Sequence, residues 1–210
     1  MPPNDAVVVC YVVRHGVTSL NQDKRFRGNA NPELAPQGIK EAHKLASLFG
    51  PIEISHIFCS DKHRATRTAE IIAEAKGVPI HKSEQLRALD VGNFSGQKRT
   101  PEAESDLQKY LDQPEVTIPG GESLQNFKDR IAPCLQQAVN LYCECGVPPL
   151  LVCHSSIIHE VGALLMGGHK NVLVEPGGAV AIYSRNGKLS AEPIYRPLKV
   201  PPSSHAGTIT

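Results

Sequence analysis

Apolar residues follow two different spacings along the chain, and the two spacings alternate. An uninterrupted apolar run predicts a buried strand at residues 6–13, and residues 52–59 and 150–153 also read as strands. Apolar residues at intervals of three and four predict helices at 37–49, 61–76, 124–142 and from 157 to about 165. Strands that alternate with helices are typical of a mainly parallel sheet covered by helices on both faces.

The remaining segments complete this picture. Residues 78–81 read as a short strand, 85–96 as an irregular segment and 101–111 as a short polar helix. Asn186-Gly187 joins apolar stretches at 179–183 and 189–194, which predicts a β-hairpin. We therefore expect an α/β three-layer sandwich with a mostly parallel central sheet and one antiparallel edge. A single domain is expected over residues 1–196, followed by a disordered tail at 197–210.

Helix boundaries have their own signals. Ser60 follows the second strand as an expected N-cap, and Ser123 closes a Pro-Gly-Gly-Glu loop as the expected cap of the longest helix. Residues 17–36 read as a long loop directly after the first strand. Loops of this length in a small domain are usually functional or disordered.

Charge and cysteine content limit the class of protein. The 210 residues include 22 Lys and Arg against 21 Asp and Glu, which argues against nucleic acid or an anionic membrane as the main partner. No apolar stretch approaches a transmembrane length, and no signal peptide precedes the first strand. Three of the six cysteines, Cys10, Cys59 and Cys153, lie in predicted strands. We expect a soluble cytoplasmic monomer or homodimer with reduced thiols.

Three strand ends carry cations or imidazoles. Arg14 and His15 end the first strand, and Arg64 lies about one turn into the helix after the second. His154 ends the third strand, just before Ser155 begins a helix with unpaired amides. The carboxyl ends of parallel strands meet at one edge of a sheet, so these groups are expected to converge. Such a set favours a phosphate dianion.

Seven motifs occur in order along residues 7–185: Arg14-His15-Gly16-x-Thr18-x-x-Asn21, Arg27-Gly28, Leu34-x-x-x-Gly38, Cys59-Ser60-x-x-x-Arg64-Ala65-x-x-Thr68-Ala69, Leu86-Arg87-x-x-Asp90-x-Gly92-x-Phe94-x-Gly96, Gly120-Gly121-Glu122-Ser123 and Val152-Cys153-His154. Together these motifs resemble those of the histidine phosphatase, or phosphoglycerate-mutase-like, superfamily. The resemblance implies this family's α/β fold and phosphoryl transfer without a metal or a cofactor.

The resemblance also implies roles for individual residues. His15 would be the nucleophile that accepts the phosphoryl group, and Arg14 and Arg64 would bind its oxygens. His154, if protonated beside the phosphate, would be a further donor. The residues expected to bind the substrate are Asn21, Gly28, Glu122 and the amide of Ser155.

The chain departs from the family pattern at Ala88. A glutamate usually occupies this position in the phosphatase and mutase branches and protonates the leaving group. Asp90, two residues further along an extended segment, and Glu122 are alternative acids. Their other interpretations are a turn-capping aspartate and a charge at a helix N-terminus. A substrate with a good leaving group, such as a phosphohistidine or an acyl phosphate, would need no acid, and an alanine introduced by engineering would look the same.

These observations favour a phosphatase that hydrolyses a small phosphorylated metabolite through a phosphohistidine on His15. A phosphoglycerate mutase is the second hypothesis, although only residues 97–119 separate Gly96 from Gly120, which leaves little chain to enclose an intermediate. The third is a weakly active or inactive module that binds a phosphorylated ligand. Selectivity is expected from residues 22–33 and 97–119, whose cations Arg25, Arg27, Lys98 and Arg99 are interpreted as solvated surface charges.

Overall fold

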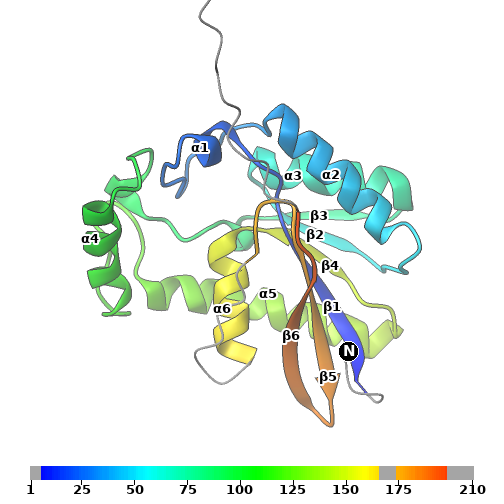
Figure 1. Ribbon diagram of the computed structural model, residues 1–210. Helices are drawn as coiled ribbons and strands as arrows, with labels where there is room; N and C mark the ends of the chain where they lie inside the picture. Colours follow the sequence, from blue (N-terminus) through cyan, green and yellow to red (C-terminus); the bar gives the residue numbers. More distant parts are fainter. Residues whose placement is uncertain (1–5, 166–173, 198–210) are drawn as a thin grey trace, which may run out of the picture.

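The computed structural model describes residues 6–165 and 174–197. In this part of the chain six strands form one sheet in the order β3-β2-β4-β1-β5-β6 (Figure 1). Strand β4 pairs in parallel with β1 and β2, β2 pairs in parallel with β3, and β5 runs antiparallel to β1 and β6. This arrangement confirms the predicted fold class. The strands are β1 (Val7–Arg14), β2 (Ile57–Ser60), β3 (Ile80–Ser83), β4 (Leu150–Cys153), β5 (Ala179–Arg185) and β6 (Lys188–Tyr195).

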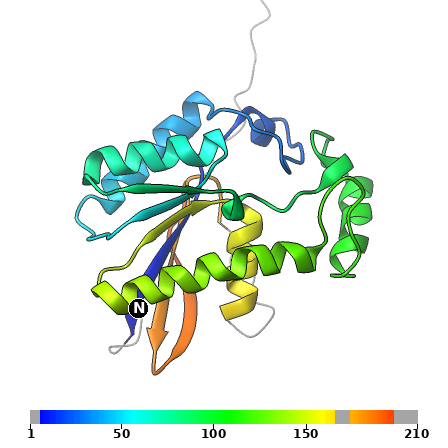
Figure 2. The same ribbon diagram turned by 180° about the vertical axis from the view of Figure 1, so that it is seen from behind.

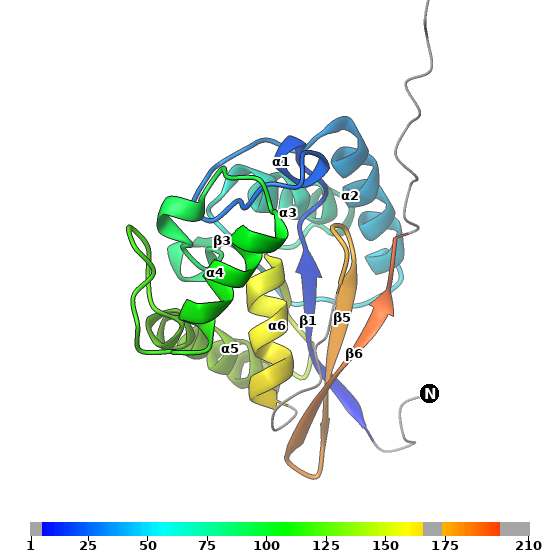
Figure 3. The same cartoon turned by 60° about the vertical axis from the view of Figure 1, so that its left-hand side comes forward.

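Helices cover both faces of the sheet. Helices α2 and α3 pack on one face and α5 and α6 on the other, with α4 standing at one side (Figures 2 and 3). None of the helices in the described ranges combines the length and the hydropathy needed to span a membrane. The helices are α1 (Ser19–Gln22), α2 (Pro36–Phe49), α3 (His63–Lys76), α4 (Pro101–Leu111), α5 (Leu124–Cys145) and α6 (Ser155–Leu165), with 3₁₀ turns at Glu84–Leu86 and Gly92–Phe94.

Strand β1 divides the hydrophobic core into two clusters. Tyr11 and Val13 pack toward α2 and α3, whereas Cys10 and Val12 pack toward α5 and α6. Successive side chains of a strand point to opposite faces, and both faces are covered here. This explains why the strand reads as one continuous apolar run. The thiol of Cys10 is buried, which raises its pKa, so it behaves as a small apolar group.

The strand order places the ends of β1, β2 and β4 side by side. Arg14 of β1 is in register with Cys153 of β4, and Cys59 of β2 is in register with Val152 of β4. The residues that follow these three strands therefore meet at one edge of the sheet, as the sequence predicted.

Several boundaries differ from the predictions. Strand β2 begins at Ile57 because its ladder with β4 starts where Ile57 faces Leu150, and the preceding residues form a turn. Strand β3 is displaced by two residues and ends at Ser83. The predicted loop over 17–36 contains α1, and a bridge between Thr18 and Leu34 closes it.

The N-terminus of α3 is also capped differently. The helix begins at His63 rather than directly after Ser60, and its N-cap residue is Lys62. The side-chain oxygen of Asn31 accepts a hydrogen bond from the amide of His63 at 2.8 Å. A residue from the distant 17–36 segment thus satisfies an amide that the sequence assigned to Ser60.

Other local predictions are confirmed. Asn186 (φ 48°) and Gly187 (φ 75°) form the hairpin turn between β5 and β6. The hydroxyl of Ser123 accepts a hydrogen bond from the amide of Asn126 at 3.1 Å and caps α5, a helix that runs through Pro133. Helix α4 has the predicted bounds. The predicted tail after residue 197 lies outside the described residues.

Gly38 offers a test of how tightly α2 packs against the segment after β1. A Cβ at Gly38 would overlap the carbonyl oxygen of Val17 and lie 2.8 Å from its amide nitrogen. We expect Gly38→Ala to lower the free energy of unfolding by about 1–3 kcal/mol, because backbone on both sides must shift. Urea denaturation measures this, and Lys40→Ala, at an exposed position of the same helix, should be nearly neutral. A Gly38→Ala protein as stable as the parent would contradict the close packing.

Candidate active site

His15 lies just beyond β1, and its ring is held in one orientation. The side chain is fully buried, and Nδ1 lies 2.7 Å from the carbonyl oxygen of Gly16. A carbonyl oxygen only accepts hydrogen bonds, so Nδ1 carries the ring proton and Nε2 keeps its lone pair. Arg64 Nε donates to the same Nε2 at 3.2 Å, which agrees with this tautomer. The ring therefore presents an unprotonated nitrogen.

The backbone around His15 is fixed from several directions. The amide of His15 donates to the carbonyl of Cys153 at 3.1 Å, and its carbonyl accepts from the amide of Gly177 at 3.1 Å. The next amide, that of Gly16, donates to the hydroxyl of Thr68 at 3.2 Å. The amide of Val17 donates to the carboxylate of Glu41 at 2.8 Å. These contacts hold His15 in place without using its Nε2 atom.

Arg64 and His154 carry buried polar atoms without partners. Arg64 is fully buried and donates from Nη1 to the carbonyl of Ala30 at 2.8 Å, while its Nη2 has no partner within the described residues. Both ring nitrogens of His154 are likewise buried and unpartnered there. The rings of His15 and His154 lie edge to face with centroids 5.2 Å apart. Buried polar groups are nearly always satisfied in proteins, so these atoms point to a ligand.

Both imidazoles are neutral near neutral pH. The pKa of His15 is well below its usual 6.5, because of burial first, then the neighbouring His154, and then the positive charges of nearby arginines. Burial and the same arginines also lower the pKa of His154. The uncharged form is the one that a phosphoryl acceptor needs. The sequence expectation of a protonated His154 depends on a phosphate that would offset these cations.

Arg14 reaches the same region from the end of β1. Its Nη1 donates to the carbonyl of Val174 at 2.6 Å, and its Nε is buried without a partner in the described part of the chain. Burial lowers the pKa of Arg14 to about 10, and the nearby carboxylates of Glu175 and Glu41 act in the opposite direction. Arg14 therefore stays protonated at neutral pH and retains a free donor.

Arg27 is less exposed than the sequence predicted. Its side chain is half-buried, and burial together with Arg14, Arg64 and Arg99 lowers its pKa to about 9. Its positive charge lowers the pKa of both His15 and His154. The interpretation of Arg27 as a solvated charge is wrong, and we call Arg14, Arg27 and Arg64 the cation cluster.

The sequence signal for Arg27 is the Arg27-Gly28 motif, in which Gly28 is a buried residue with φ of 44°. A Cβ at Gly28 would approach Val91 Cγ2 to 2.8 Å, so the turn after Arg27 must pass close to the 88–96 segment. Gly28 thus shapes the turn. Lys98 and Arg99 are exposed, as expected, and Arg25 donates from Nη1 to the carbonyl of Gly96 at 2.7 Å.

Two of the predicted neutral donors have groups that are available to donate. Asn21 accepts hydrogen bonds at its side-chain oxygen from the amide and hydroxyl of Thr18, at 3.0 and 2.9 Å, which leaves its amide nitrogen to donate. The first hydrogen bond of α6 runs from the amide of Ile158 to the carbonyl of His154. The amide of Ser155 therefore belongs to the unpaired first turn of the helix, next to His154.

The two predicted acids both have hydrogen-bond partners within the protein. Asp90 accepts a hydrogen bond from the amide of Gly92 at 3.0 Å, which is the turn-capping role. Glu122 accepts from Arg130 at 2.7 and 3.2 Å and from the amide of Asp90 at 2.9 Å. Glu122 thus joins the 88–92 segment to α5, and these contacts do not support a role in binding substrate. Ala88 offers only a methyl group.

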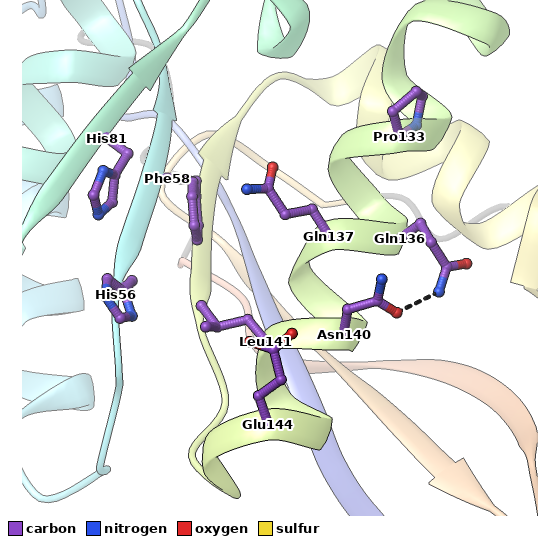
Figure 4. A pocket seen from close by; sticks show the side chains of 9 residues that line it. All are labelled: His56, Phe58, His81, Pro133, Gln136, Gln137, Asn140, Leu141 and Glu144. Carbon is purple, nitrogen blue, oxygen red and sulfur yellow. Dashed lines mark hydrogen bonds between the residues drawn. The ribbon is translucent and has the colours of Figure 1, made fainter.

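A separate hollow lies away from these residues, between β2, β3 and the C-terminal half of α5 (Figure 4). Its volume is about 570 Å³, and the rings of His56, Phe58 and His81 line one side. It contains none of the groups described above. No group of three or more histidine, cysteine or acidic side chains suited to a metal ion occurs in the described ranges.

Comparison with known proteins agrees with the geometry. A family model described as the histidine phosphatase superfamily (branch 1) matches residues 10–177. A curated relative, the probable phosphoglycerate mutase GpmB of Salmonella choleraesuis (strain SC-B67), is 34% identical over 161 residues, which cover 75% of this chain and 74% of that protein.

Solved structures show the same fold. The alpha-ribazole phosphatase from Shigella flexneri has a TM-score of 0.74 at 23% identity, over 88% of this chain and 94% of that one. A mycobacterial glucosyl-3-phosphoglycerate phosphatase complexed with VO3 has a TM-score of 0.74 at 22% identity, over 91% and 98% of the two chains.

The buried neutral imidazoles predict an acid-sensitive fold. Below a pH of about 6.5 the unfolded chain protonates His15 and His154, whereas the folded chain keeps them neutral. The unfolded state then binds more protons, so the free energy of unfolding falls as the pH falls. Each histidine adds at most about 1.4 kcal/mol per pH unit to this slope.

We expect His154→Gln to reduce the slope between pH 6.5 and 5, measured by urea denaturation. His43→Gln, at an exposed position on α2, should leave it unchanged. Equal slopes for the parent and the His154→Gln variant would show that His154 is not held neutral.

Proposed function

Because the chain belongs to the histidine phosphatase superfamily (branch 1), we propose that it is a metal-independent phosphatase that hydrolyses a small phosphorylated metabolite through a phosphohistidine on His15. The observation that carries this proposal is the tautomer of His15. Its Nδ1 donates to the carbonyl of Gly16. Its unprotonated Nε2 accepts from Arg64 Nε, and its ring lies beside that of His154 and near the unpartnered Nη2 of Arg64. A neutral imidazole with a free lone pair can attack phosphorus without a separate base.

The first step would transfer the phosphoryl group to the protein. The Nε2 atom of His15 forms a bond to phosphorus while the bond to the leaving oxygen breaks. Arg64 exchanges its hydrogen bond to Nε2 for bonds to the phosphoryl oxygens, together with the unpaired Nε of Arg14. Forked, charge-assisted hydrogen bonds from these guanidiniums stabilise the negative charge of the transition state.

The second step would release phosphate. A water molecule attacks the phosphorus of the phosphohistidine, the N–P bond breaks, and Nε2 regains its lone pair. The amide of Ser155 and the amide nitrogen of Asn21 are suited to hold phosphoryl oxygens in both steps. The side chains supply the charge, so the proposed mechanism uses no metal and no cofactor.

A phosphoglycerate mutase is the second candidate, because the curated relative at 34% identity carries that name. In a mutase the phosphohistidine passes its phosphoryl group back to a bound intermediate instead of to water. The 97–119 segment, which would have to cover such an intermediate, contains one regular element, the helix α4. A segment this short leaves little chain to enclose an intermediate, which favours hydrolysis.

The phosphohistidine can be tested directly. We expect the protein to release p-nitrophenol from p-nitrophenyl phosphate, and a rapid quench to trap a phosphoryl adduct that acid removes and base preserves. His15→Ala should lose both, and His43→Ala should keep both. Activity that persists in His15→Ala would exclude the mechanism, whereas phosphate binding without turnover of any sugar or amino-acid phosphate would favour the binding module.

The two candidate activities differ in their products. With 3-phosphoglycerate we expect inorganic phosphate and glycerate to accumulate and no 2-phosphoglycerate to form. Phosphorus NMR distinguishes these products in one sample. Formation of the isomer faster than the release of phosphate would identify a mutase.

A further inference from the structure

Breaking the bond between phosphorus and an alkyl oxygen requires a proton for the oxygen that leaves, and a positioned acid typically contributes about 10²–10⁴-fold. The two candidate carboxylates already have partners. Asp90 caps Gly92 through Oδ1 and accepts from Nδ2 of Asn29 at 3.5 Å, and Glu122 is paired with Arg130. Lys62 is a further group that can carry a proton at this site.

Lys62 is fixed next to the cation cluster. Its Nζ donates to the carbonyl of Asn29 at 3.0 Å, and Arg64 donates to the next carbonyl, that of Ala30, at 2.8 Å. The ammonium and the guanidinium therefore bind neighbouring carbonyls of one turn. Arg64 in turn contacts Nε2 of His15. This chain of contacts places Lys62 at the rim of the site that holds the nucleophile.

Lys62 also lies beside the segment that contains Ala88. Arg87 forms a two-pronged ion pair with Asp61, with Nε 2.8 Å from Oδ1, which joins the residue before Ala88 to the residue before Lys62. On the other side of Ala88, the amide of Leu89 donates to the hydroxyl of Ser156 in the first turn of α6 at 3.1 Å. Residues 87–89 thus span from the start of α3 to the start of α6.

The charges around Lys62 favour proton donation. The negative charges of Asp61 and Asp90 raise the pKa of Lys62, whereas the positive charges of Arg87 and Arg64 lower it. The charge of Lys62 in turn lowers the pKa of His154. Partial burial and these cations lower the pKa of Lys62. It remains an ammonium at neutral pH and is a stronger acid than a solvated lysine.

We propose that Lys62 is the catalytic acid and base of this phosphatase: its Nζ gives a proton to the leaving oxygen and later takes one from the attacking water. In the first step the N–P bond forms, the P–O bond breaks and the proton from Nζ completes the alcohol. In the second step the neutral amine accepts a proton from water as the oxygen of that water attacks phosphorus and the N–P bond breaks. The inference rests on the proposed function.

The test compares substrates whose leaving groups differ in their need for a proton. We expect Lys62→Met to lower kcat/KM for glycerol phosphate by about 10²–10⁴-fold. For p-nitrophenyl phosphate, whose phenolate leaves without a proton, the loss should stay below about tenfold. Lys62→Arg keeps the charge but cannot give up a proton, so it should behave like Lys62→Met on glycerol phosphate. Lys82→Met, at an exposed position on β3, is the matched control and should be unchanged.

Two further measurements separate proton transfer from a structural effect. The alkaline limb of the pH profile for glycerol phosphate should be present in the parent and absent from Lys62→Met. Adding Ala88→Glu to Lys62→Met should restore part of the turnover of glycerol phosphate and move its optimum to lower pH, because a carboxylic acid then supplies the proton.

The outcomes distinguish this inference from the proposed function. Equal losses on both esters, or full activity of Lys62→Arg on glycerol phosphate, would show that Lys62 acts only through its charge. A loss selective for glycerol phosphate in Asp90→Asn but not in Lys62→Met would assign the acid to Asp90. A parent protein without activity on either ester would instead overturn the proposed function.

Discussion

The proposed chemistry depends on the hydrogen bond between Nδ1 of His15 and the carbonyl oxygen of Gly16. This contact fixes the tautomer, and with it the nitrogen that would attack phosphorus. Thr68 of α3 and Glu41 of α2 hold the backbone after β1 by accepting from the amides of Gly16 and Val17. The packing of two helices on one face of the sheet therefore supports the orientation of the histidine ring.

The cation cluster lowers the stability of the folded state. Three guanidiniums are gathered around two neutral imidazoles, and the described residues leave Nε of Arg14 and Nη2 of Arg64 without partners. Such an arrangement disfavours the folded state, because buried donors lose hydration and like charges repel. A phosphate dianion, the ligand of the proposed reaction, would satisfy the donors and offset the charges at the same time. Such a site would be complementary to its ligand at the expense of stability, as expected where function and stability compete.

Predictions from the sequence are correct where the structure of an element depends on residues that are close to it in the chain. The continuous apolar run of β1, the Asn186-Gly187 turn and the cap at Ser123 depend on neighbouring residues, and all three are confirmed. Predictions failed where a partner lies far away in the sequence. The amide of His63 is capped by Asn31, a contact that no local pattern of Ser60 could reveal. Tertiary contacts override local preference in such cases.

The same distinction applies to the site. His15, Arg64 and His154 could be placed together from the sequence because each follows a strand, and the ends of neighbouring parallel strands meet. Arg27 and Lys62 could not, because the position of each depends on how the 27–31 turn lies on the start of α3. The spacing of Asp90 from Ala88 made it a candidate acid. In the structure its carboxylate accepts a hydrogen bond from the amide of Gly92 within a local turn.

The cation cluster also bears on what kind of acid suits this site. A positive potential lowers the pKa of every group within it. A carboxylic acid in that potential is driven toward the carboxylate, which has no proton to give, unless the bound phosphate cancels the field. An ammonium in the same potential still carries its proton at neutral pH and gives it up more readily, as the lowered pKa of Lys62 illustrates. With a third arginine at position 27 and a methyl group at Ala88, the electrostatics of this chain suit a lysine better than a carboxylate as the partner of His15.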